Sequence, residues 1–116
     1  MCSCDYEPPS AFWETKPKAK KRHKCSECRG WIEAGEGYTA TRGIWDGSAS
    51  SYKTCSDCWE LAAWAEDKSD CLCLAYSQWH SGILDDAYDS GDADYLAEAK
   101  ARIAAIRNKR RDAVAA

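Results

Sequence analysis

The sequence predicts a small α+β domain that folds around a bound metal ion, and three observations lead to this fold class. Two C-x2-C motifs, Cys25–Cys28 and Cys55–Cys58, stand 26 residues apart. Strand-type residues and a turn signal lie between the motifs, and helical periodicity follows the second. Large aliphatic side chains are few for a chain of 116 residues, so a core without a staple would be marginal. Structural zinc can contribute roughly 10–16 kcal/mol, which matches the whole stability of a typical domain.

The eight cysteines predict two zinc ions per chain. A C-x2-C pair turns both sulfurs towards one point about 2.3 Å from each, so the two motifs supply one closed tetrahedral site. Two C-x-C pairs can supply a second site if they lie in extended or turn segments, and the alternative for them is buried or free thiols. His80 could replace a cysteine of the second set, and His23 could replace one at either site. The predicted ligands are Cys25, Cys28, Cys55 and Cys58 for the first ion, and Cys2, Cys4, Cys71 and Cys73 for the second.

The first 15 residues predict an extended arm. Pro8-Pro9 favours a polyproline-like path, and Phe12 and Trp13 are expected to pin the arm to the body. A basic run, residues 16–24, follows. It is either a solvated linker or a patch that contacts phosphates or an acidic partner.

A zinc knuckle and a β-hairpin are predicted next. Gly30 supplies the residue tolerant of positive φ that a tight turn after the first motif needs. Residues 38–41 and 51–54 carry strand-type side chains, and Asp46-Gly47 between them is a strong hairpin turn signal.

A helix over residues 56–67 is predicted to carry the second cysteine pair in its first turn. Thiolate charge there lies at the positive end of the helix dipole, where free backbone N–H groups can bond to sulfur. This order of knuckle, hairpin and helix resembles a treble-clef zinc finger, similar in layout to LIM-type modules. The resemblance covers Cys25 to about Asp67, and Ile32 and Gly35-Glu36 look like the apolar residue and glycine turn that follow such knuckles.

The whole outline is similar to small zinc-finger proteins of bacteriophages and prophages. That resemblance implies a protein of a bacterial host's cytosol and no particular activity.

Two further helices are predicted after the finger. Residues 74–87 place Tyr76, Trp79 or His80, Ile83 and Ala87 on one face. Ser90-Gly91-Asp92 ends that helix and caps a longer one over residues 93–114. The apolar stripe of the longer helix (Leu96, Ala99, Ile103 and Ile106) either packs on the domain or serves a partner.

These elements divide the chain into two units. Residues 1–90 form the zinc-binding domain, with a core finger over 25–67 and the N-terminal arm clipped to 71–73. Residues 91–116 form a C-terminal amphipathic helix.

Charge and composition argue against a non-specific nucleic-acid binder, a membrane protein and a secreted protein. The formal net charge of −3 is a poor one for a non-specific nucleic-acid binder. No run approaches the roughly 18–20 apolar residues of a membrane span. The N-terminal residues carry neither the basic region nor the apolar region of a secretory signal. We therefore expect a cytoplasmic protein that uses its cysteines for metal rather than for disulfides.

We expect neither catalytic activity nor a small-molecule substrate. Neither histidine accompanies a nucleophile motif, a phosphate-binding glycine loop or a deaminase signature. Four-cysteine sites are closed, so the zinc would not activate water. The acids between residues 85 and 94 fit no calcium loop and indicate a solvated acidic face.

Two functions remain. The first, favoured by the net acidity, is a protein-interaction module that modulates or inhibits a host protein. Ile44 and Trp45 at the hairpin tip would anchor it, unless Trp45 folds back on the finger, and Asp85, Asp86 and Asp89 could meet a basic surface. The second is a nucleic-acid-binding zinc finger, provided that the fold brings two basic clusters, 16–24 and 107–111, to one face. Its predicted contacts are Lys16, Lys18, Lys20, Lys21, Arg22, Arg110 and Arg111.

Overall fold

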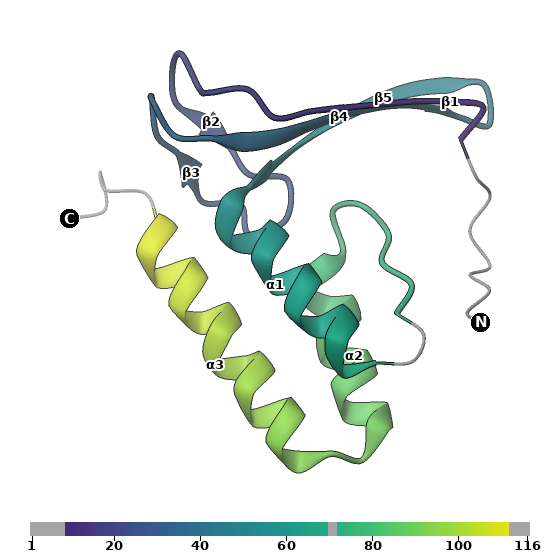
Figure 1. The fold of residues 1–116 in the computed structure, drawn as a ribbon, viewed down its shortest axis with the longest axis vertical. Helices are drawn as coiled ribbons and strands as arrows, with labels where there is room; N and C mark the ends of the chain where they lie inside the picture. The colour runs from purple at the N-terminus through teal and green to yellow at the C-terminus, as the bar shows by residue number, and fades with distance from the viewer. Residues whose placement is uncertain (1–8, 70–71, 112–116) are drawn as a thin grey trace.

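The computed structural model describes residues 9–69 and 72–111. In this part of the chain an antiparallel sheet lies across one end of the molecule and three helices lie below it (Figure 1). The small α+β class predicted from the sequence is therefore confirmed. Two helices follow the hairpin and its helix, as expected.

The main sheet has three strands in the order β1 (Ala11–Thr15), β4 (Tyr38–Trp45) and β5 (Ser48–Cys55). Strands β4 and β5 form the predicted hairpin, but each is longer than the sequence indicated. Its two-residue turn has φ of 50° at Asp46 and 78° at Gly47, which is the left-handed pair that a type I′ turn needs.

Strand β1 was not predicted. Within the segment expected to be an extended arm, Ala11 pairs with Ile44 and Thr15 with Ala40, so β1 is an edge strand of the sheet. The pinning role expected of two aromatic residues is only half right. Phe12 lies edge-on to Trp45 at 6.4 Å between ring centroids, whereas Trp13 is 57% exposed.

A second, two-stranded sheet flanks the first cysteine motif. It pairs β2 (His23–Lys24) with β3 (Trp31–Ile32), so the chain enters and leaves the knuckle through adjacent antiparallel strands.

The three helices are α1 (Ser56–Lys68), α2 (Trp79–Ser90) and α3 (Ala93–Arg110). The bounds of α1 match the prediction to one residue. Helix α2 begins five residues later than predicted, because Ser77 has a left-handed φ of 71°. Asp92 caps α3 by accepting hydrogen bonds from the next turn, and the predicted end of this helix at residue 114 lies outside the described residues.

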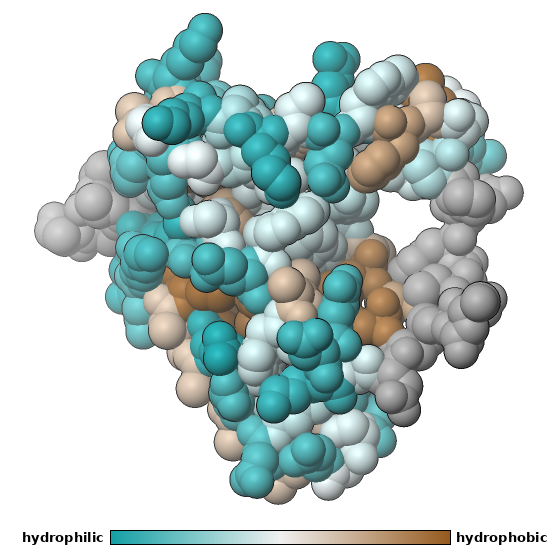
Figure 2. Space-filling model, viewed as in Figure 1, coloured by the Kyte–Doolittle hydropathy of each residue, from teal (hydrophilic) through white to brown (hydrophobic). Residues whose placement is uncertain are grey.

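The core lies between the knuckle, α1 and the inner faces of α2 and α3. The metal-motif cysteines, Ile32, Leu61, Ile83 and Ala99 are among its most buried members. Ile103 and Ile106 of the predicted stripe pack there too, so this stripe serves the domain. The division of the chain at residue 90 stays a prediction. The face drawn in Figure 2 is mostly hydrophilic, with hydrophobic areas that include one at the hairpin end of the sheet.

Candidate metal centre

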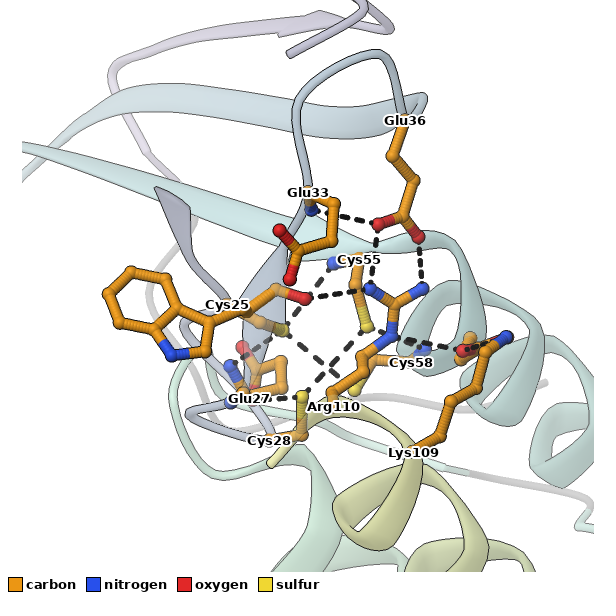
Figure 3. A network of polar contacts seen from close by, with 12 residues as sticks. Cys25, Glu27, Cys28, Glu33, Glu36, Cys55, Cys58, Lys109 and Arg110 are labelled. Carbon is orange, nitrogen blue, oxygen red and sulfur yellow. Dashed lines mark hydrogen bonds and ion pairs between the residues drawn. The ribbon is translucent and has the colours of Figure 1, made fainter. Parts of the chain in front are cut away.

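Four cysteines from three elements meet at one end of α1 (Figure 3). Cys25 follows β2, and Cys28 lies in the turn before β3. Cys55 ends β5 and is the N-cap of α1, while Cys58 lies in the first turn of that helix. The predicted placement of the second pair at a helix N-terminus is therefore confirmed.

The four sulfurs have the spacing of a tetrahedral site. All lie within 4.8 Å of one another, with 3.9 Å between Cys25 and Cys58 and 4.0 Å between Cys28 and Cys55. Ligands about 2.3 Å from a central zinc ion would lie roughly 3.8 Å apart. All four side chains are buried. The group can hold a metal ion, and four sulfurs in this arrangement suit zinc.

Backbone N–H groups already point at these sulfurs. Cys25 Sγ accepts from the N–H of Glu27 and of Cys55, and Cys28 Sγ accepts from that of Gly30, each at 3.4 Å. Cys55 Sγ accepts from the N–H of Cys58 in the first turn of α1. Such bonds favour the thiolate form, so the backbone is prepared for bound metal.

Four thiols at these distances cannot all ionise unaided. Hydrogen bonds from the other three lower the pKa of Cys25, whereas hydrogen bonding to Cys25 raises the pKa of Cys55 and Cys58. A divalent cation would stabilise all four thiolates at once.

The knuckle differs from the sequence interpretation in one respect. The left-handed residue is Arg29, with φ of 63°, and not Gly30. Glycine is required at position 30 for space, because a Cβ there would lie 2.4 Å from Cβ of Arg110 and 2.5 Å from its carbonyl oxygen. The end of α3 therefore rests directly on the knuckle.

The acid within each C-x2-C motif ties a later helix to the metal centre. Glu27 is buried, and its carboxylate accepts from the N–H of Ser77 at 2.8 Å and of Trp79 at 3.0 Å. It thus caps α2, whose N-cap residue Gln78 makes no side-chain bond. Burial raises the pKa of Glu27, and the two N–H bonds offset part of that rise.

Asp57, in the second motif, binds α3. Arg110 is only 4% exposed and donates from Nε to Asp57 at 3.0 Å, from Nη1 to the carbonyl of Trp31 at 3.0 Å, and to both oxygens of Glu36. Lys109 also pairs with Asp57. Burial acts to raise the pKa of Asp57, but these two cations outweigh it and lower the pKa, and Arg110 lowers the pKa of Glu36.

His80 of α2 completes the surroundings of the metal centre. Arg107 Nε donates to His80 Nδ1 at 3.2 Å, and because a guanidinium has no acceptor, the imidazole proton must lie on Nε2. Nε2 is 3.2 Å from Cys58 Sγ and therefore donates to it. Burial, followed by the charge of Arg107, lowers the pKa of His80 to about 4, so the ring is neutral. The sequence linked His80 to the second cysteine set, but the structure places it beside the first.

The second cysteine set cannot be assembled from the described residues. Cys2, Cys4 and Cys71 lie outside them, and Cys73 is disulfide-bonded. A disulfide sulfur is not a thiolate ligand, so the structure does not give Cys73 the metal role predicted for it, and the second zinc ion stays a prediction that the described residues do not support.

The residues predicted to bind a protein partner differ in how exposed they are and in whether they already have contacts within the protein. Trp45 is half-buried in an aromatic cluster with Phe12, Tyr52 and Tyr76. Ile44 is half-buried, and Asp85 and Asp89 are exposed. Asp86 accepts hydrogen bonds from Ser69 and from Tyr95, so it has an internal role.

The residues predicted to bind nucleic acid are divided in the same way. Lys18, Lys20, Lys21 and Arg111 are exposed. Lys16 lies 4.0 Å above the Trp59 ring, and Arg22 pairs with Glu33. Arg110 points into the protein, which removes the centre of the 107–111 cluster from the surface.

Sequence reasoning missed the part that five side chains play around the metal centre. They are Glu27, Glu36, Asp57, Arg107 and Arg110. The repeated pattern Cys-Ser-acid-Cys at residues 25–28 and 55–58 was the available signal for two of them.

Comparison of the chain with protein-family models, with curated proteins and with solved structures gave no match. Within residues 9–69 and 72–111, no helix has the length and apolar character needed to cross a membrane.

Proposed function

We propose that this chain is a non-catalytic zinc-binding module in which the metal ion organises a surface for a macromolecular partner. The four-sulfur group is the observation that carries the proposal. Four cysteine ligands leave no coordination position for water, which suits a structural ion. The metal centre also anchors α2 through Glu27 and α3 through Asp57, so one ion orders most of the fold.

The resemblance to a treble-clef finger belongs to this proposal. Its support is the order of knuckle, β4–β5 hairpin and α1 along the chain. A phage origin and a place in the bacterial cytoplasm rest on the resemblance of the outline alone.

A host protein is one candidate partner. The exposed Asp85 and Asp89 support contact with a basic surface. Ile44 at the hairpin end supports an apolar contact, but Trp45 has a packing role that accounts for its presence there. In this form the module would modulate or inhibit the protein that it binds.

Nucleic acid is the second candidate, and one observation favours it. The exposed Trp13 shares a face of the main sheet with the cations Arg42 and Lys53, and no described element covers that face. The cluster at 107–111, in contrast, no longer supports this candidate.

Metal content tests the proposal directly. Purified protein should carry a zinc ion on the four-cysteine group, and chelation should abolish its cooperative thermal transition. Cys58→Ser should remove the first ion and unfold the domain, because structural zinc supplies roughly 10–16 kcal/mol.

Ser56→Ala, an exposed change in the same helical turn, is the matched control and should leave both metal content and unfolding unchanged. A wild-type chain without bound metal, or a Cys58→Ser chain with the wild-type transition, would contradict the proposal. A count of one zinc ion per chain would refute the predicted second site only.

A further inference from the structure

No element of the described part of the chain covers the outer face of the main sheet. Cross-strand partners share a face, so Trp13, Arg42 and Ser51 form one row on it, and Ala11, Ile44 and Ala49 form the next. Thr15, Ala40 and Lys53 form a third row. All nine residues are exposed or half-buried. The opposite face carries Thr41, Thr54 and the Trp45 cluster, and it faces the helices (Figure 1).

The edge strand β1 presents the indole of Trp13 on this outer face. Trp13 is 57% exposed, and its ring makes no aromatic or cation contact within the described part of the chain. Its directly opposite neighbour is Arg42, and Ile44 lies diagonal to it. Together with Ser51 they line a hollow of about 310 Å³, roughly ten times the share of liquid volume of one water molecule.

The charge of the outer face is positive. Arg42 and Lys53 are its only ionisable side chains among the described residues, and neither forms an ion pair there. Lys18, Lys20 and Lys21 follow β1 directly in the chain and are exposed. A flat aromatic ring beside unpaired cations matches a base and its phosphates, which is how proteins bind single strands.

The net acidity of the protein does not cancel this local charge. The acidic residues 85–94 surround the α2–α3 turn, at the end of the molecule away from the sheet (Figure 1). The molecule extends 41 Å along its longest axis, several times the screening length of about 8 Å at physiological salt.

We propose that the outer face of the sheet binds single-stranded nucleic acid, with a base stacked on Trp13 and phosphates held by Arg42 and Lys53. This inference deepens the proposed function and rests on it, because the metal centre joins β5 to α1. A duplex fits less well, since its bases are already stacked on one another and cannot cover the indole.

Fluorescence anisotropy with a labelled oligothymidylate about ten nucleotides long tests the inference, because one small sheet module covers roughly 4–16 nucleotides. Trp13→Ala should weaken binding about 5- to 150-fold, and Trp13→Phe should recover most of it. Tyr88→Ala is the matched control, because this aromatic residue on α2 is 74% exposed and should not affect binding.

The salt dependence tests the cations. Each phosphate contact on a single strand adds about 0.7 to the slope of log affinity against log salt, so Arg42→Gln and Lys53→Gln should each reduce the slope by about that amount. Lys100→Gln on the exposed side of α3 should leave the slope unchanged.

The outcomes separate this inference from the proposed function. A folded, zinc-loaded chain that does not bind the oligonucleotide, or binds it equally well as Trp13→Ala, overturns the inference and leaves the metal role intact. Capture of a protein that depends on Trp13 and survives nuclease, without affinity for the oligonucleotide, overturns it in favour of a protein partner. Binding that depends on Trp13 in a chain without metal would instead overturn the proposed function.

Discussion

The two ends of the main sheet treat their side chains in opposite ways. At the metal end, groups far apart in sequence are buried together, and Arg110, Glu36 and Asp57 satisfy one another's charges. At the hairpin end, Trp13 and Arg42 lie open to solvent without partners among the described residues. Buried charge is costly unless it is paired, so the first region specifies the fold. Exposed, unpaired groups cost little and remain free to bind.

The largest effect that separates the two ends is expected from Arg110→Met. It leaves Glu36 without its cation and Asp57 with Lys109 alone. The change should cost about 2–4 kcal/mol of unfolding free energy, below the value for a fully buried pair because both acids keep some exposure. Urea unfolding of the zinc-loaded protein measures this.

Arg111→Met, at the exposed neighbour, and Trp13→Ala, at the hairpin end, are the controls and should change stability by less than about 0.5 kcal/mol. Equal losses for all three variants would remove the distinction between the two ends.

A metal-affinity effect is expected from His80, which acts on the metal centre through Cys58. His80→Ala removes the N–H that bonds to the sulfur, and loss of such an outer contact typically weakens metal binding about 10- to 100-fold. Competition with a coloured chelator measures the affinity, and the sulfur-to-metal absorption of the cobalt form reports the bond itself.

His80→Gln retains an N–H donor and should lose less affinity than His80→Ala. An unchanged cobalt spectrum in His80→Ala would show that the ring contributes packing alone.

The sequence predicted a structure well where that structure depends on interactions between residues close together in the chain, and poorly where it depends on distant ones. The cysteine motifs and the Asp46-Gly47 turn specify geometry over a few residues, so their structures could be predicted. Strand β1 depends on pairing with β4 some thirty residues away, and no local pattern shows it.

The same reasoning explains two residues that were misread. Basic side chains at the end of α3 are what any helix dipole favours, so Arg110 looked like a surface cation. Glu27 caps a helix that begins about fifty residues later, and this cap is also what makes the start of α2 unpredictable from its own residues.

The smallest expected effect is a difference in stability between two glycine variants. It tests whether α3 rests on the knuckle at the metal end. Gly30→Ala places a Cβ against the backbone of Arg110 and should cost about 1–3 kcal/mol, as overpacking does. Gly37→Ala meets no atom within 4 Å and has no positive φ, so it should be neutral or stabilise by about 0.4–1 kcal/mol.

Thermal unfolding of the two variants at saturating zinc gives the comparison. Equal stabilities would mean that α3 does not rest on the knuckle. Gly30→Ala pushes the backbone of Arg110 away from the knuckle and so strains the ion pairs that Arg110→Met removes. The double variant should therefore lose less than the sum of the single losses. An additive result would show that the ion pairs of Arg110 with Asp57 and Glu36, and its close approach to Gly30, hold α3 independently of each other.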